Sequence, residues 1–411
     1  MWDITVDTSE DPVTSDVLFA LQLRTANEPL FPKLDSFTCR GATEAFIPSI
    51  PSFLSRKTTS INIEFAEGLH PVVVASMIIR LSMVSPDLEC ITLNPLPRDP
   101  VITEAVSEML LTCNRDSLEW FCVDSPLTDE AYEVILQLPE LSVLWVAIQG
   151  CARVPPVALP NLSLIDLQYD DHLDWLQGFR GATLGGLEVV YFTSQSEQIG
   201  DFIGEFTRVA LTTSAPTTLL KFVFKTSRPW DPDYRSLLPF MQLKNLQIGF
   251  SCGNHCSSTV DDDIVMDLAQ AMPRLEILKL GDAPCGTIRG VTVRGLMALA
   301  RDCRHLSELR IHFRASSLAE AVDDVGVLVP SDGGTVVRRN DCVLTVLEVG
   351  EIPISPNSVL VVTMILLQIF PYLLNVKFIE GGWKDVAENI KLFQRIGYFV
   401  QHAGKCVPPV P

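Results

Sequence analysis

A six-residue apolar pattern recurs along almost the whole chain and constrains the fold more than any other feature. Its first, fourth and sixth positions are apolar, as in residues 275–280 (LEILKL). Twelve matches begin at Leu34, Leu88, Leu118, Leu141, Leu162, Leu187, Leu219, Leu243, Leu275, Leu306, Leu344 and Leu373. A thirteenth segment, beginning at Thr58, lacks only the first apolar residue. Self-similarity at intervals of 21 to 38 residues indicates a repeat architecture.

The pattern also predicts local structure. Its alternating half has the period of two typical of a strand, so we expect the fourth and sixth positions to face the core. The third, fifth and seventh positions should then face outward. Segments with a helical period lie between matches, such as Ala131, Val134, Ile135 and Leu138 behind a capping Thr128. Alternating strands and helices imply parallel strands joined by right-handed crossovers.

Together these features predict an α/β leucine-rich-repeat solenoid, a horseshoe of about thirteen repeats. A parallel β-sheet would line its concave side and helices its convex side. The alternative is an ordinary α/β sheet whose strands happen to match the pattern. We expect residues 1–33 to be a partly loose N-terminal cap, 34–382 the solenoid, and 383–411 a C-terminal capping helix and tail. The long interval before Leu344 predicts an exposed loop near residues 328–341.

Composition limits the classes of partner that the chain is expected to bind. The net charge is −19 and the pI about 4.7, which disfavours a phosphate backbone and hence nucleic acid. The longest apolar stretch, Val359–Phe370, is shorter than the ~20 residues needed to span a bilayer, so we expect a buried helix there and no membrane contact. Eleven cysteines, mostly in apolar repeat segments, predict reduced buried thiols. With no secretory signal at the N-terminus, we expect a cytoplasmic or nuclear protein.

Outward strand positions are the candidate binding residues. In the first half of the chain they include Trp120, Asp124, Trp145, Asp166, Gln168 and Tyr191. In the second half they include Lys221, Lys225, Lys279, Arg310, His312 and Lys377, against Glu308 and Glu348. We hypothesise that an acidic or phosphorylated peptide lies along the second half, with an aromatic anchor near Trp145. The alternative is that these are ordinary solvated strand faces.

None of the other motifs in the sequence predicts a catalytic or metal-binding site. Residues 252–256 (CGNHC) resemble half a zinc site, but no second Cys/His pair follows at a useful spacing. Asp261, Asp262 and Asp263 precede a predicted helix, whose N-terminus favours carboxylates. Asp170, Asp171 and His172 lack a Gly-x-Ser-x-Gly nucleophile, and the chain has no Gly-x-x-x-x-Gly-Lys phosphate loop. We therefore expect no catalytic residues, no metal and no cofactor.

The chain resembles the repeat portion of fungal F-box-type leucine-rich-repeat proteins over roughly residues 20–400. The most telling pieces are residues 27–34 (NEPLFPKL), 90–93 (CITL) and the helix-then-strand unit 260–280. In that family an N-terminal F-box docks on a Skp-type adaptor of a cullin-type ubiquitin ligase, and the repeats hold a substrate. The resemblance thus implies a substrate-recognition component of such a ligase.

One part of the family pattern is missing. Residues 1–33 contain no Leu-Pro start and are too few for an F-box. Either the sequence is truncated, or the docking module has been lost. The second case favours an alternative role as a free-standing repeat scaffold or adaptor with no ubiquitin-ligase link. An enzyme is a third possibility, for which the sequence offers no motif.

Overall fold

Parallel strands in chain order form the framework of the computed structural model. It describes residues 2–8, 20, 29–114, 116–148, 164–169, 186–191, 202–211, 215–226, 233–250, 260–281, 290–311, 342–349, 354–378 and 382–403. The chain divides into unit 1, Met1–Glu197 with Arg208–Thr218, and unit 2, Gln198–Thr207 with Leu219–Pro411.

Unit 1 contains eight described strands, each paired in parallel with the next. They are β1 (Asp3–Asp7), β2 (Ser36–Ala42), β3 (Ser60–Phe65), β4 (Cys90–Asn94), β5 (Trp120–Pro126), β6 (Val143–Ile148), β7 (Leu164–Tyr169) and β8 (Gly186–Tyr191). The described helices are η1 (Ile47–Ser52), α2 (Pro71–Val84), α3 (Pro100–Thr112), α4 (Asp129–Ile135) and α6 (Ala215–Thr218).

Unit 2 repeats this plan with six described strands. They are β9 (Lys221–Thr226), β10 (Asn245–Phe250), β11 (Ile277–Leu280), β12 (Glu308–Arg310), β13 (Val346–Glu348) and β14 (Asn375–Lys377). The helices are α5 (Phe202–Ala210), which ends in unit 1, η3 (Tyr234–Leu237), α7 (Asp262–Ala271), α8 (Val293–Asp302), η4 (Pro356–Ser358), α10 (Val359–Ile369) and α11 (Trp383–Ala403).

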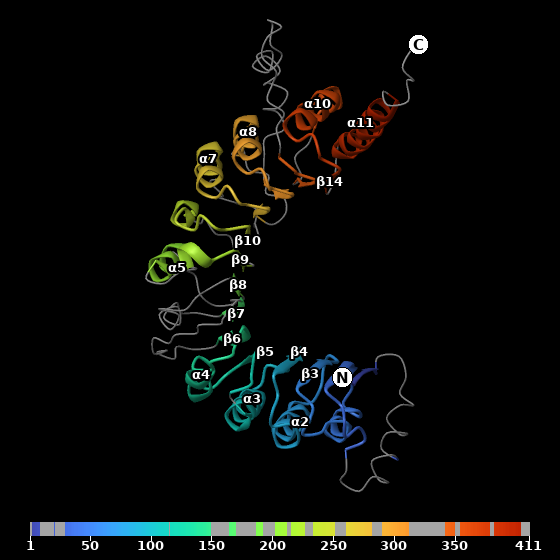
Figure 1. Cartoon of the computed structure of the whole chain (residues 1–411), viewed down its shortest axis with the longest axis vertical. Coiled ribbons are helices and arrows are strands. Elements are labelled where there is room, and N and C mark those ends of the chain that lie inside the picture. Colours follow the sequence, from blue (N-terminus) through green and yellow to red (C-terminus); the bar gives the residue numbers. More distant parts are fainter. Residues whose placement is uncertain are drawn as a thin grey trace, which may run out of the picture. The chain divides into compact units, whose positions relative to one another are not determined.

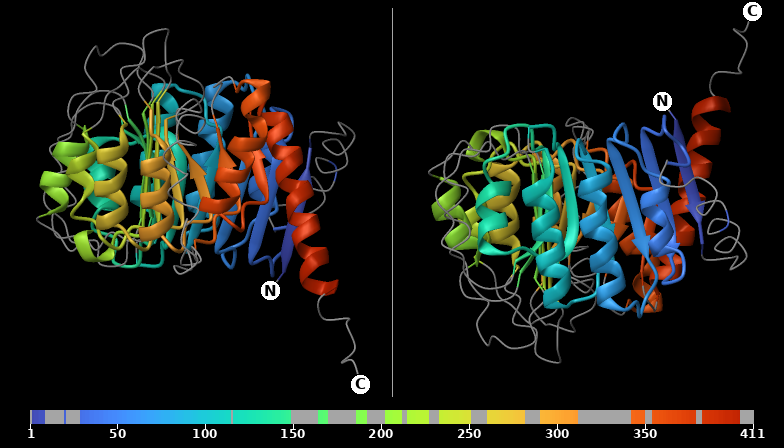
Figure 2. Two further views of the ribbon diagram at one scale, coloured as in Figure 1. Left: turned by 90° about the horizontal axis from the view of Figure 1, so that it is seen from above. Right: turned by 90° about the horizontal axis from the view of Figure 1, so that it is seen from below.

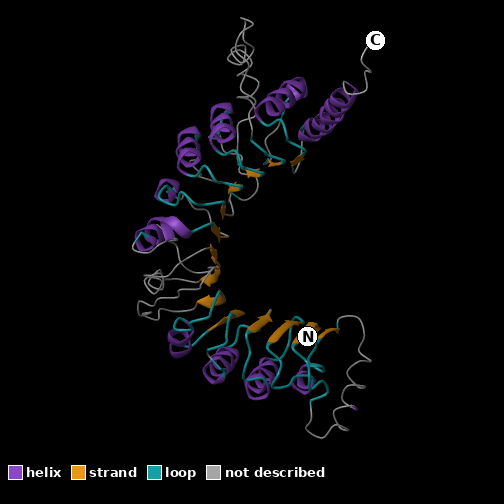
Figure 3. Ribbon diagram, viewed as in Figure 1, coloured by secondary structure: helices purple, strands orange, loops and turns teal. Residues whose placement is uncertain are grey.

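Within each unit, strands form one layer and helices cover one face of it (Figure 1 and Figure 3). Helices that follow one another in the chain lie side by side, as α2 does with α3 and α7 with α8 (Figure 2). This arrangement follows from parallel pairing, because the chain must cross back between strands and a helix makes that connection. The predicted α/β class with parallel strands is confirmed, whereas the horseshoe solenoid stays a prediction.

Helix starts follow the sequence signals. Thr128 caps α4, its hydroxyl accepting a hydrogen bond from the Ala131 backbone N–H at 3.4 Å. Asp99 caps α3 in the same way through the N–H of Val101 at 2.9 Å, with Pro100 at the first helical position. Short polar side chains at these positions satisfy backbone donors that have no partner within the helix.

The inner face of each sheet carries the core. Fourth and sixth positions of the pattern are buried in nearly every strand whose side chains are described, with Phe378 half-buried as an exception. The largest of these core side chains are Phe37, Phe121, Phe222 and Phe224. Each buried large apolar side chain contributes about 1.5–3 kcal/mol. The predicted inward positions are therefore confirmed for these strands, whereas some of the predicted outward positions, among them Cys122, Val143 and Val223, are also buried.

The sequence interpretation missed one strand. β1 pairs with β2 and places Ile4 opposite Phe37 and Val6 opposite Cys39, which are the fourth and sixth positions of their repeat. The pattern therefore also matches residues 1–6 (MWDITV), with Met1 as its first apolar position. The N-terminal segment, predicted to be a partly loose cap, contributes an edge strand.

One motif start was wrong by three residues. The register of β7 and β8 pairs Leu187 with Ile165, which is a fourth position. Leu187 is therefore also a fourth position, and the repeat begins at Leu184 rather than at Leu187. The error arose because residues 187–192 (LEVVYF) satisfy the same spacing by chance.

The C-terminal helices depart partly from expectation. The stretch predicted as a buried helix forms α10, but Leu360 and Met364 on it are exposed by 52% and 59%. α11 begins at Trp383, which is fully buried together with Val386 and Ile390. The divisions proposed at residues 33 and 382 stay predictions. The expected loop at 328–341 and the tail after 403 lie outside the described residues.

Candidate functional site

Strand register aligns the outward side chains of unit 2 into rows. The fifth positions of successive repeats are direct neighbours across the sheet, from β9 to β14. This row consists of Val223, Gln247, Lys279, Arg310, Glu348 and Lys377. Three of the five lysine and arginine candidates from the sequence in this half of the chain thus lie in a single line on three strands, and His312 lies outside the described residues.

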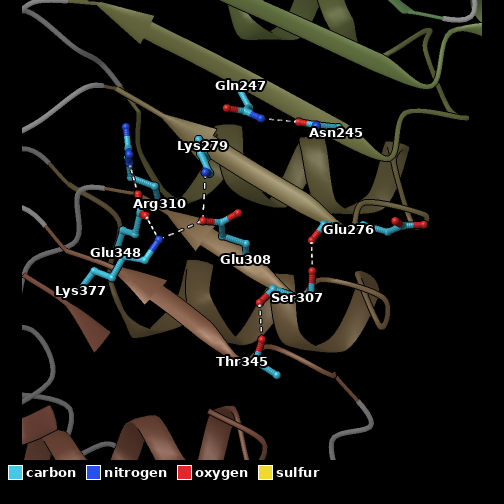
Figure 4. A network of polar contacts seen from close by, with 10 residues as sticks. All are labelled: Asn245, Gln247, Glu276, Lys279, Ser307, Glu308, Arg310, Thr345, Glu348 and Lys377. Carbon is cyan, nitrogen blue, oxygen red and sulfur yellow. Dashed lines mark hydrogen bonds and ion pairs between the residues drawn. The ribbon is translucent and has the colours of Figure 1, made fainter. Parts of the chain in front are cut away.

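The charged members of this row, with Glu308, form one connected network that we call the charge ladder (Figure 4). The Lys279 ammonium lies 2.9 Å from a Glu308 carboxylate oxygen. Lys377 lies 3.5 Å from the same oxygen and donates a hydrogen bond to Glu348 at 2.7 Å. Arg310 donates through Nε to the other oxygen of Glu348.

The ladder follows from the spacing of the sheet. Adjacent strands lie about 4.8 Å apart, so Lys279 and Arg310, which are opposite each other in register, would repel. Glu308, two residues before Arg310 on β12, neutralises Lys279, while Glu348 on β13 neutralises Arg310. The two carboxylates thus offset the repulsion between neighbouring cations of the row.

The carboxylates of the ladder lie deeper than two of its cations. The side chain of Glu348 is 11% exposed and that of Glu308 is 21% exposed, against 35% for Arg310 and 52% for Lys377. Burial raises the pKa of Glu348, but hydrogen bonds from Lys377 and Arg310 outweigh it, so that pKa lies below its ordinary value. The hydrogen bond to Glu348 raises the pKa of Lys377. Both shifts favour the charged pair.

Lys221 and Lys225 on β9 stand apart from the ladder. Register places Lys221 opposite Asn245 and Lys225 opposite Gly249, so β10 lies between them and β11. On β10, Gln247 donates a hydrogen bond to Asn245 at 2.9 Å (Figure 4). Lys221 is half-buried and Lys225 is exposed. The outward face therefore continues from the ladder through a neutral polar strand to two further lysines.

In unit 1 the aromatic candidates lie on neighbouring strands, β5 and β6. Trp120 is 42% exposed, whereas Trp145 is half-buried and its indole N–H is buried without a hydrogen-bond partner. Trp145 is opposite Cys122, a fifth-position residue that is itself buried. Trp120 is thus an accessible aromatic group, and Trp145 mainly packs against its neighbours.

Asp124, at the seventh position of β5, accepts a hydrogen bond from the backbone N–H of Leu96 at 2.8 Å. Burial raises the pKa of Asp124 above its ordinary value despite that hydrogen bond and the nearby charge of Arg98. The hydrogen bond and the nearby charge therefore do not offset the effect of burial on this carboxylate, in contrast to Glu348.

The remaining three candidates of unit 1, Asp166, Gln168 and Tyr191, belong to strands whose backbone alone is described; Gln168 is opposite Ala147. Asp166 is opposite Trp145 in register and therefore continues the fifth-position row. Tyr191 is opposite Tyr169, off that row, and Glu188 takes the place opposite Asp166. The corrected motif start moves the expected fifth-position residue of β8 from Tyr191 to Glu188.

The acidic triplet 261–263 serves two helix starts. Asp261 accepts a hydrogen bond from the N–H of Ile264 and caps α7. Asp262 accepts hydrogen bonds from the N–H groups of Thr292 at 2.7 Å and Gly295 at 3.1 Å, at the start of α8. A Cβ at residue 295 would lie 2.6 Å from an oxygen of Asp262, so only glycine fits there. The predicted structural role is confirmed for this triplet.

Groups that could support chemistry do not gather in the described residues. No cluster of three or more His, Cys, Asp or Glu suited to a metal occurs among them. Of the thiols predicted to be buried, Cys113, Cys122 and Cys303 are buried, whereas Cys90 is half-buried. Burial raises the pKa of Cys113 and Cys303 to about 12, far from a reactive thiolate. Residues 170–172 and 252–256 lie outside the described residues. In the part of the chain that the structure covers, no helix has the length and apolarity to cross a membrane.

Comparison with known proteins provides little information about the function of this chain. No family model matches the chain, and no curated protein matches it. Among solved structures, the complex of Rad7 and Elc1 in yeast has a chain that is similar over 84% of this chain and 69% of its own, with 10% identity and a TM-score of 0.38. A likeness of this size leaves the function to be argued from the residues themselves.

Proposed function

We propose that this protein is a leucine-rich-repeat solenoid that binds a protein or peptide on its outward strand face. One observation carries the proposal. Fourth and sixth positions are almost uniformly apolar and buried, whereas third, fifth and seventh positions differ from strand to strand, from Trp120 to Lys279 to Glu348. In stacked repeat proteins the strand face away from the helices forms an extended binding surface, so chemical variety on that face is typical of recognition.

The partner we propose is acidic or phosphorylated along unit 2. Arg310 and Lys377 keep much of their side chains exposed above the carboxylates that neutralise them, and Lys225 is exposed further along the face. Cationic heads held in fixed positions are suited to acidic groups, because part of the ordering cost is met before binding. In unit 1, Trp120 supplies an accessible aromatic contact.

At a finer level, we propose a substrate-recognition component of a cullin-type ubiquitin ligase in the cytoplasm or nucleus. The resemblance of the repeat segments to fungal F-box-type proteins supports this role. The second candidate is a free-standing scaffold or adaptor without a ligase link. Neither role requires catalysis, and the buried thiols and paired charges described above offer no nucleophile.

Affinity capture with the full chain tests the binding face. The triple variant K279E/R310E/K377E reverses the cations of the ladder. Its matched control, R235E/K244E/R274E, makes the same charge change in unit 2 at exposed pairs outside the row. We expect partners captured by the native chain to be lost with the first variant and kept with the second. Equal capture by both folded variants would contradict the proposed face.

A pull-down with a Skp-type adaptor separates the two roles. Direct capture of the adaptor by the purified chain would support the ligase component, whereas substrate capture without the adaptor would support the scaffold.

A further inference from the structure

The charge ladder carries a residue whose role the proposed function leaves open. Glu348 is the least exposed ladder member and holds two cations at once, Lys377 at 2.7 Å and Arg310 through Nε. Glu308 similarly serves Lys279 and Lys377. The three cations of the ladder therefore meet two carboxylates, and the ladder as a whole carries a single excess positive charge.

We infer that Glu348 is a specificity-determining residue, an internal carboxylate that occupies Arg310 and Lys377 in competition with an acidic partner. The inference rests on the proposed function, since it assumes that an acidic segment binds this face. It goes beyond that function because it proposes that one side chain determines how acidic a partner must be in order to bind.

The physical reason is charge balance. A single carboxylate brought to Arg310 and Lys377 would only replace Glu348 and would be repelled by it at close range. A run of carboxylates gains more, because it reaches Lys279, Arg310 and Lys377 together. These three lie in one row over three strand spacings, about 14 Å in all. The partner selected in this way is an extended segment with several consecutive acidic residues.

The lowered pKa of Glu348 is consistent with this role. It keeps the side chain ionised near neutral pH, so the internal competitor is present under ordinary conditions. Weakly acidic segments are then excluded by an existing ion pair rather than by shape. Such a built-in repulsive element provides specificity against near-neutral partners.

Glu348→Gln in the full chain tests the inference by fluorescence anisotropy with labelled hexaglutamate. Glutamine keeps the shape and an acceptor oxygen but removes the charge. We expect the variant to bind hexaglutamate about tenfold more tightly at low salt, and the gain to shrink at about 0.15 M salt, because partly exposed charges are screened. Binding of hexaglutamine, the neutral probe, should not change.

Glu276→Gln is the matched control. Glu276 pairs with Lys244 at 2.8 Å in the same unit and undergoes the same change of charge, but both side chains are about half exposed and lie outside the ladder. Circular dichroism and thermal unfolding establish that both variants are folded at the temperature of the binding measurement. A gain for Glu348→Gln no larger than that for Glu276→Gln would overturn the inference and leave Glu348 a structural counter-ion.

The same experiment gives a different result if the proposed function itself is wrong. If the native chain and both variants bind hexaglutamate no better than hexaglutamine, the acidic partner itself is wrong, and the inference falls with it. If the native chain prefers hexaglutamate but Glu348→Gln gains nothing, only the inference fails.

Discussion

The two units have the same inner face and different outer faces. In both, fourth and sixth positions bury apolar side chains, as Phe121 does in unit 1 and Phe222 in unit 2. On the fifth-position row, none of the described residues of unit 1 is basic, whereas three of the six in unit 2 are. The row in unit 1 consists of Thr5, Thr38, Asn62, Thr92, Cys122, Trp145, Asp166 and Glu188, and in unit 2 of Val223, Gln247, Lys279, Arg310, Glu348 and Lys377. The repeat pattern determines what is shared, and individual positions determine what differs.

The units also differ in how their polar groups are compensated. The ladder of unit 2 pairs each of its charges with at least one opposite charge. In unit 1, the buried Tyr132 hydroxyl and the Trp145 indole N–H have no hydrogen-bond partner, and burial raises the pKa of Asp124. On their outer faces, unit 2 therefore gains stability from its ion pairs, while unit 1 retains a buried indole N–H and a partly buried carboxylate at some cost.

The largest effect tests the shared inner face. Phe121→Ala and Phe222→Ala should each lower the free energy of unfolding by about 3–5 kcal/mol, because both delete a fully buried ring. In unit 2 the ring of Phe222 also lies 5.0 Å from that of Phe206. Urea unfolding with amide exchange resolved by unit measures both. A loss below about 1 kcal/mol for either would show that the two cores are not equivalent.

The next effect separates the outer faces. Glu348→Lys leaves Glu308 as the ladder's remaining carboxylate among four cations, so we expect a loss of about 2 kcal/mol, moderated by solvent screening at Lys377. Glu119→Lys, at an exposed position of unit 1, should change stability by less than about 0.5 kcal/mol. Thermal unfolding of both variants provides the comparison. Equal losses would mean that the ladder is no more than a surface ion-pair set.

A smaller effect with the opposite sign concerns the uncompensated hydroxyl in unit 1. Tyr132→Phe should raise stability by about 1 kcal/mol, because it removes a buried group with no hydrogen-bond partner. Thr58→Val is the contrasting control, since the Thr58 hydroxyl donates to the Leu34 carbonyl at 3.0 Å and accepts from the Ser55 N–H. Denaturant midpoints should move in opposite directions; a loss in both would reveal a partner for Tyr132.

The smallest expected effect is that the stabilities of two regions change in opposite directions with pH. The pKa of Glu348 is lowered in the folded state, so its contribution is present above its unfolded value and is lost as the pH falls through the folded value. The pKa of Asp124 is raised, so its contribution is present at low pH and is lost as the pH rises through the folded value. As the pH falls from neutral, the region around Asp124 should gain protection before the pH reaches the ordinary value of 3.8, whereas unit 2 should lose protection mainly below the ordinary value of 4.5.

Amide exchange by mass spectrometry, corrected for intrinsic rates, measures that divergence. Glu348→Gln should remove the response in unit 2, and Asp124→Asn should remove the response near β5. Parallel changes in both regions would contradict the opposite signs.

Much of the fold was predictable because strand formation depends on short-range apolar spacing. All thirteen matched segments contain a described strand, and the capping roles of Thr128 and Asp261 follow from local chemistry. The strand at residues 3–7 was also within reach, since Met1, Ile4 and Val6 fit the same pattern. The misplaced start at Leu187 was harder, because two registers of the sequence satisfy the pattern and only pairing with β7 separates them.

The candidate site was predictable only in part. The alternation of side chains along each strand identified Lys279, Arg310 and Lys377 as outward basic residues. It did not reveal their pairing with Glu308 and Glu348. A comparison of third and fifth positions in adjacent repeats would have placed Glu308 and Glu348 beside these cations. The burial of the Trp145 indole N–H had no signal in the sequence, because it depends on packing around β6.

The sequence by itself determined the parallel strand–helix repeat and which side chains enter the core, since both depend on periods of two and 3.6 residues along the chain. Only the tertiary structure decided the state of the outward charges. Residues about 30 or more positions apart, such as Arg310 and Glu348, become neighbours solely through strand register, and that register determines whether they repel or neutralise one another.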